Sequence, residues 1–199
     1  MSTTTLIIII VVVVIVIALL AIYFAMRRRR AQRSEQQRER TREEFGSEYE
    51  RTAEERGSEE DAERELRERR GRVERRVEPL SEESRQRYGE QWEEVERVFV
   101  DNPERSIEMA DRTVSDILEE RNYVADPAQS DEETERDLAV THPEVADDYR
   151  EARRIRAVIV SRSGRASEGE SSGEGEETTE EMRQAIRKYR VVYERIVQE

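Results

Sequence analysis

The sequence predicts an all-α protein with one N-terminal transmembrane helix, a charged helical stalk and a small helical bundle, and three observations predict it. Residues 6–26 form an uncharged, almost wholly apolar run of 21 residues, long enough as a helix to cross roughly 30 Å of hydrocarbon. Charged residues make up 42% of the chain, so little of it is left to form a core. From residue 79 onward the apolar residues recur every three or four positions, which is the period of a helix.

Four arginines directly follow the apolar run and indicate which way it crosses the membrane. A secretory signal peptide would instead carry its positive charge before a shorter apolar region, and residues 1–5 have no charged side chain. Because positive clusters stay on the cytoplasmic side, residues 1–5 are expected outside and the rest inside. The expected location is therefore the cell (inner) membrane, as a single-pass protein with the N-terminus outside and a cytoplasmic soluble domain.

The segment after the span is strongly basic, whereas the chain as a whole has a net charge of −13. Residues 27–42 hold eight arginines against two glutamates. Basic residues near a bilayer are attracted to anionic headgroups by about 1 kcal/mol each, so a membrane-surface role is expected for Arg27, Arg28, Arg29, Arg30 and Arg33. A nucleic-acid partner is not expected, because the acidic body would repel phosphates.

Residues 27–78 are expected to form the basic juxtamembrane segment and the charged stalk. Glutamates precede arginines by four positions in several places, as expected for an exposed helix: Glu60/Arg64, Glu63/Arg67, Glu65/Arg69 and Glu68/Arg72. Gly46 and Gly57 mark breaks, and Ser58 with Asp61 predicts a new helix start.

The apolar stripe of this stalk is narrow and leaves two interpretations open. Leu66, Val73 and Leu80 are seven residues apart, which permits a short coiled coil. A solvated helix that rests one edge on the following domain is an equally good interpretation.

Residues 79–199 are expected to form the bundle, starting after Pro79. Helix starts are predicted at Ser81, at Asn102 followed by Pro103, at Ser130 with Glu133, at residues 141–144, and at Thr178 with Glu181. The Gly/Ser/Glu-rich residues 163–177 predict a disordered linker.

Two helices of the bundle carry large apolar faces that are expected to line the core or a partner surface. The six side chains are Tyr88, Trp92, Phe99, Ile186, Tyr189 and Tyr193. A terminal helix as amphipathic as 178–197 needs a docking surface. Since the preceding linker can span a helix length, this helix is expected to fold back onto the helices of residues 82–160.

No residue pattern predicts catalysis, a cofactor or a metal. The chain has one histidine, His142, and no cysteine, and a lone histidine at a helix start favours a structural or solvent-exposed role over catalysis or ligation. Carboxylates are so frequent that paired acidic spacings arise by chance, and the glycines of residues 164–175 lie among glutamates that would repel phosphate. We therefore expect a non-enzymatic protein without cofactors.

Several short motifs lie along about residues 45–197: FGSEY (45–49), PLS (79–81) with RY (87–88), Trp92 and FVDNP (99–103), HPEV (142–145) with YR (149–150), and MRQA (182–185) with YR (189–190). Together they resemble an uncharacterised family of small bacterial membrane-anchored helical proteins. Many members have Gly-Tyr-Pro where this chain has Asn122-Tyr123-Val124. The resemblance implies an N-terminal anchor and a helical body, and it implies no activity.

Two functions follow as hypotheses. The first is a single-pass membrane protein whose cytoplasmic helical domain is an adaptor or scaffold that binds another protein or self-associates. The alternative is a membrane-tethered regulator, in which the basic strip senses anionic lipid or ionic strength.

Overall fold

The computed structural model describes residues 39–126, 128–166 and 175–198. All regular secondary structure in these ranges is helical, which confirms the all-α prediction. No helix in these ranges is long and apolar enough to cross a membrane. The predicted span at residues 6–26 and the five predicted membrane-surface arginines lie outside the described residues.

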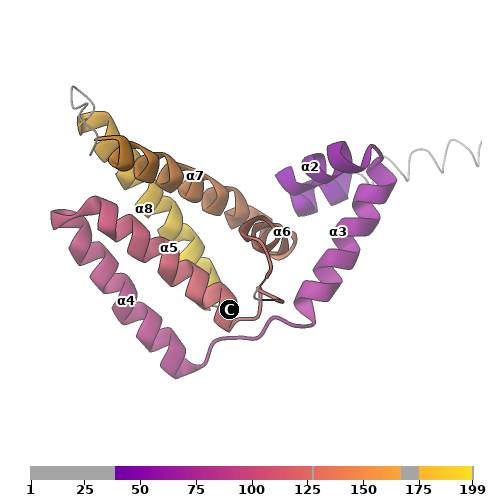
Figure 1. Ribbon diagram of the computed structural model, residues 1–199. Helices are drawn as coiled ribbons and strands as arrows, with labels where there is room; N and C mark the ends of the chain where they lie inside the picture. Colours follow the sequence, from indigo (N-terminus) through magenta and orange to yellow (C-terminus); the bar gives the residue numbers. More distant parts are fainter. Residues whose placement is uncertain (1–38, 127, 167–174, 199) are drawn as a thin grey trace, which may run out of the picture. The chain divides into compact units, whose positions relative to one another are not determined.

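The chain divides into two compact units, Met1–Glu44 and Phe45–Glu199. In the first unit the described residues, 39–44, are helical. The second unit contains helices α2 to α8 (Figure 1). The boundary expected between residues 78 and 79 lies inside this second unit. Leu66, Val73 and Leu80 of the predicted stripe are all buried in its core.

Helices α2 (Ser47–Arg56) and α3 (Glu59–Glu74) form a hairpin, called here the α2–α3 hairpin. Gly57 ends α2 at φ 66°, a left-handed conformation that a glycine adopts without a Cβ clash. The Ser58 hydroxyl then accepts a hydrogen bond from the Asp61 amide at 3.4 Å, as the sequence predicted. Only three of the sixteen residues of α3 are buried: Ala62, Leu66 and Val73.

Helices α4 (Glu82–Asp101) and α5 (Pro103–Glu120) form a second hairpin, and both begin at predicted caps. The Ser81 hydroxyl accepts from the Ser84 amide at 3.0 Å. The Asn102 side chain accepts from the Arg105 amide at 3.1 Å, and Pro103 occupies the first turn, where its missing N–H costs nothing.

The turn after α5 places Asn122 in the left-handed region, at φ 63°. The Tyr123 amide donates to the Leu118 carbonyl at 2.8 Å and the Asn122 amide to the Glu119 carbonyl at 2.9 Å. This is the Schellman pattern of helix ends, in which glycine is the commonest left-handed residue and asparagine the next best. Asn122 therefore occupies a position where glycine would be free of strain.

The remaining helices are α6 (Asp131–Thr141), α7 (Pro143–Ala166) and α8 (Gly175–Gln198). The predicted capping box of Ser130 and Glu133 is present at the start of α6. The described helices extend into both ends of the expected linker, because α7 continues to Ala166 and α8 begins at Gly175. Residues 167–174 lie outside the described residues.

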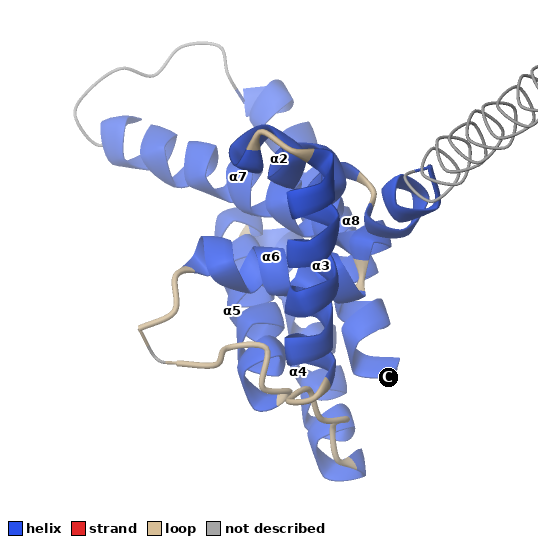
Figure 2. Cartoon of the chain, turned by 90° about the vertical axis from the view of Figure 1, so that its right-hand side faces the viewer, coloured by secondary structure: helices blue, strands red, loops and turns tan. Residues whose placement is uncertain are grey.

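The helices of the second unit pack in a continuous order that differs from the order of the chain. Helix α4 packs on α5, α5 on α8, α8 on α7, α7 on α6, α6 on α3, and α3 on α2 (Figures 1 and 2). The predicted docking of the last helix on residues 82–160 is confirmed by its contacts with α5 and α7. We call α4, α5, α7 and α8 the four-helix group, and α6 connects it to the α2–α3 hairpin (Figure 1).

Candidate functional site

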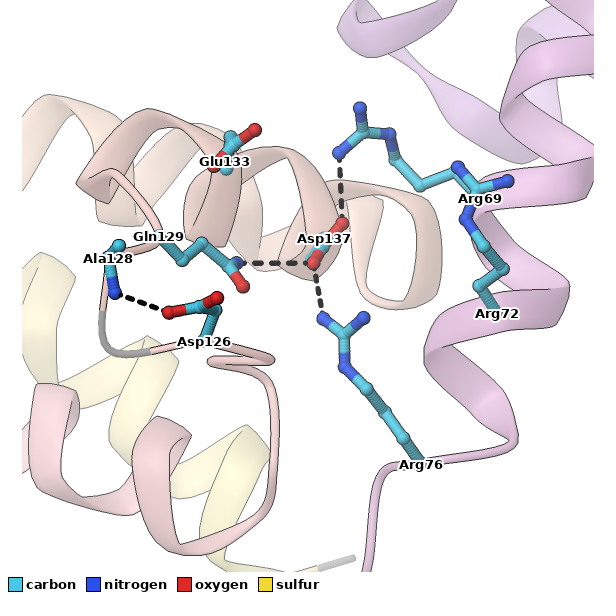
Figure 3. Close-up of a pocket in the computed structure, with 8 residues that line it drawn as sticks. All are labelled: Arg69, Arg72, Arg76, Asp126, Ala128, Gln129, Glu133 and Asp137. Carbon is cyan, nitrogen blue, oxygen red and sulfur yellow. Dashed lines mark hydrogen bonds and ion pairs between the residues drawn. The ribbon is translucent and has the colours of Figure 1, made fainter.

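A polar cleft lies where α3 meets α6 and the loop before it (Figure 3). Its volume is about 340 Å³. Two arginines of α3 and Arg76, in the turn just after α3, lie opposite carboxylates and an amide from the loop and α6. The lining residues are Arg69, Arg72, Arg76, Asp126, Ala128, Gln129, Glu133 and Asp137.

Asp137 is the centre of this cleft and is only 6% exposed. One of its carboxylate oxygens accepts from Arg69 Nη1 at 3.0 Å. The other accepts from Arg76 and, at 3.3 Å, from the Gln129 amide. Arg76 also donates to the carbonyls of Asn122 at 2.8 Å and Tyr123 at 2.6 Å. A single buried carboxylate thus links α3 and the turn after it to α6. Arg76 links the same turn to the residues that follow α5.

The charges of the cleft balance, which limits what it could bind. Three arginines lie opposite three carboxylates, and Asp137 already holds two of the arginines. Asp126 accepts from the Ala128 amide at 2.8 Å, and Glu133 is part of the capping box. A cleft without net positive charge does not concentrate anions. Because its charged groups are bonded to one another across α3 and α6, we interpret the cleft as a joint between helices. Within the described ranges, no group of three or more His, Cys, Asp or Glu is arranged to hold a metal ion.

A second polar cluster lies inside the four-helix group, around Asp111 of α5. The Asp111 carboxylate accepts from the Tyr189 hydroxyl of α8 at 2.9 Å. Arg156 and Arg153 of α7 approach the same carboxylate at 3.3 and 3.6 Å. Burial, and then the neighbouring Asp111 charge, raise the pKa of Tyr189, and burial raises the pKa of Tyr149 to about 12. Both phenols therefore stay protonated at neutral pH, and this cluster joins three helices.

A third feature is a small apolar cleft between the start of α5 and the end of α7. Its volume is about 80 Å³, and Ile107, Ile159 and Val160 line it together with Glu104, Glu108 and Arg156. Val160 is 49% exposed, and Val100, three residues before α5, is 82% exposed. This end of the four-helix group therefore presents apolar side chains to solvent beside two glutamates one helical turn apart.

The six residues predicted as a core or partner face lie mainly in the interior. Tyr88, Trp92 and Tyr189 are buried, whereas Phe99, Ile186 and Tyr193 are partly buried against the core. The structure brings Trp92 and Tyr193 into a parallel stack with ring centroids 4.5 Å apart. His142 is buried at the junction of α6 and α7, with its ring centroid 6.2 Å from that of Tyr123.

The carboxylates that organise the structure were missed at the sequence level. Asp137 pairs with arginines 68 and 61 residues away, and Asp111 bonds a tyrosine 78 residues away. With 48 acidic residues in the chain, nothing in the local sequence marks these two. The only available signal is that each sits among apolar residues of an amphipathic helix, where an exposed carboxylate would not be placed.

No family model, curated protein or solved structure matches this chain. The resemblance to the bacterial membrane-anchored family therefore stays a prediction.

Proposed function

We propose that the chain is a single-pass membrane protein whose cytoplasmic helical domain is a protein-interaction module, that is, an adaptor or scaffold. The 21-residue apolar run followed by four arginines supports the anchor and its orientation. No enzymatic step, cofactor or metal enters this proposal. The domain would act through its surface, held close to the bilayer by the anchor.

The observation that carries the interaction role is the exposed apolar surface at the end of the four-helix group. Large apolar side chains on the surface of a folded domain, next to a recess and rimmed by charge, are typical of binding sites. Here Val160 lines the cleft together with Ile107 and Ile159 and is about half exposed. Val100, near the end of α4 and three residues before α5, is also exposed. The partner of matching chemistry is a helix that inserts one apolar side chain and places a basic residue against Glu104 and Glu108.

The experiment is a mild cross-link in intact cells, followed by purification of the full-length chain. One co-purifying protein, lost with Val160→Glu and retained with Val191→Glu, supports the proposal. Val191 is a matched control because it is also about half exposed, at 45%, but lies on α8 in a different groove. A co-purifying protein that both variants retain would contradict the site, and recovery of no protein and no oligomer would contradict the function.

The alternative is a membrane-tethered sensor of anionic lipid or ionic strength, favoured by the eight arginines of residues 27–42. Vesicles with and without phosphatidylserine separate the two functions. Binding of the 27–78 segment that rises with anionic lipid and falls with salt supports the sensor, and binding independent of both contradicts it.

A further inference from the structure

We propose that the α2–α3 hairpin is a releasable flap. It detaches as one piece from α6 and α7, while the four-helix group stays folded. This inference stands independently of the proposed function. It rests on how the hairpin is attached, on where the chain can pivot, and on what each attachment costs to open.

The apolar attachment of the hairpin is thin. The two helices of the hairpin together bury four apolar residues, three in α3 and Tyr49 in α2, whereas α5 alone buries five. The hairpin packs closely on α6, with smaller contacts from α2 to α6 and α7. Segments with few buried apolar contacts open at lower free energy than the core of the same protein.

Charged groups supply much of the remaining attachment, in three places. The first is Asp137 of α6 with Arg69 and Arg76 (Figure 3). The second is the bidentate pair of Glu55 in α2 with Arg136 in α6, at 2.8 and 3.0 Å.

The third place joins α2 to α7. The buried carboxylate of Glu48 in α2 receives Arg150 of α7 at 3.5 Å, and the Ser47 hydroxyl donates to Asp147 at 2.7 Å. On opening, water can solvate all of these carboxylates and guanidinium groups, which offsets the loss of each pair. If α5 and α8 of the four-helix group separated instead, their apolar faces would be exposed to water, and no new solvation of charges would offset that cost.

The backbone offers a pivot at each end of the hairpin. The Glu78 amide donates to the Arg121 carbonyl at 3.1 Å, and Arg121 Nε donates to the Glu78 carbonyl at 3.2 Å. These two bonds hold residue 78 on the end of α5. Residues 75–77 can serve as the pivot once Arg76 releases the carbonyls of Asn122 and Tyr123, so these two Arg76 bonds also break on opening. At the other end Gly46, at φ 54°, precedes α2 and adopts a conformation open to few other residues.

Opening would expose the Leu66 and Val73 stripe of α3 together with the face of α6 that carries Asp137. Both surfaces are covered when the flap is closed, because Leu66, Val73 and Asp137 are all buried.

The test uses the full chain in detergent or nanodiscs and two independent reporters. The chain has no cysteine and one tryptophan, so cysteines introduced at the exposed positions Glu60 in α3 and Glu119 in α5 can carry a fluorescence-transfer pair without background. Trp92, stacked on Tyr193, reports the four-helix group. In a urea titration the transfer efficiency should fall before the Trp92 signal changes.

Variants separate release of the flap from general destabilisation. Asp137→Asn should raise the open-to-closed ratio roughly a hundredfold, because it removes the charge from a buried ion pair. Glu55→Gln should raise it by a smaller factor. Glu151→Gln is the matched control, because Glu151 pairs with Arg154 at 2.6 Å inside α7 and crosses no joint.

Two results would overturn the proposal. One is a transfer signal that changes together with the Trp92 signal in the unsubstituted chain and in both joint variants. The other is a flap that opens as much with Glu151→Gln as with Glu55→Gln. An earlier transfer transition that moves with Asp137→Asn and Glu55→Gln alone supports it.

Discussion

Replacing Tyr189 by phenylalanine removes a single buried hydroxyl and should destabilise the domain measurably. Tyr189 is fully buried, and its hydroxyl donates to the Asp111 carboxylate at 2.9 Å. The aromatic ring remains, so the substitution leaves little cavity. The expected loss is therefore that of one hydrogen bond to a charged acceptor.

The magnitude follows from what remains around Asp111. A hydrogen bond to a charged group contributes about 1.5–3 kcal/mol to the free energy of unfolding. In Tyr189→Phe the Asp111 carboxylate keeps Arg156 at 3.3 Å and Arg153 at 3.6 Å. Because the carboxylate is not left unpaired, we expect the lower end of that range, about 1.5–2 kcal/mol.

The assay is urea unfolding of the full chain, followed by Trp92 fluorescence and circular dichroism. Tyr193→Phe is the control, because Tyr193 is in the same helix and its hydroxyl makes no hydrogen bond within the described residues. The control should change the unfolding free energy by less than about 0.5 kcal/mol. Equal effects of the two substitutions would refute the view that the Asp111–Tyr189 bond stabilises the core.

Three further predictions concern single positions. Asn122→Val should lower the unfolding free energy by about 1–2 kcal/mol, because a β-branched residue is strained at φ 63°, whereas Asn122→Gly should not lower it. Urea unfolding of both variants checks this, and equal losses of unfolding free energy would contradict it. Arg121→Met should lower the unfolding free energy by about 2–4 kcal/mol, because the carbonyls of Glu78 and Ile196 lose the guanidinium that donates to both. In the same urea assay, a loss below about 0.5 kcal/mol would contradict this role of Arg121. Burial raises the pKa of Glu48 above its usual 4.5, with Arg51 and Arg150 opposing the shift. Its contribution to stability is then complete below about pH 4.5 and is lost as the pH rises through the raised pKa. Glu48→Gln should therefore gain stability relative to the unsubstituted chain between pH 4.5 and 7, and a difference that does not change with pH would contradict this sign.

The helix starts could be predicted from the sequence because they are local. Ser81, the Asn102–Pro103 pair and the Ser130–Glu133 box each act within one turn of chain, and each is found where the sequence placed it. The end of α5 was also placed correctly, near Asn122.

The packing of α3 could not be predicted, because its narrow apolar stripe is compatible with two arrangements. Leu66 and Val73 fit a coiled-coil seam or a helix edge resting on a domain, and the structure shows them buried in one unit with the rest of the domain. In the folded structure Asp137 of α6 receives Arg69 and Arg76, and these contacts favour the packing of α3 on α6. Long-range ion pairs of this kind leave no local pattern in a chain with 42% charged residues.

The most direct test of the central proposal places a photo-cross-linkable residue at position 160 or 191 of the full-length chain in living cells. A membrane-anchored interaction module that uses the apolar cleft predicts one cross-linked species from position 160 and none, or only a weak one, from position 191. Cross-links that are the same from both positions, or absent from both, would contradict the proposal.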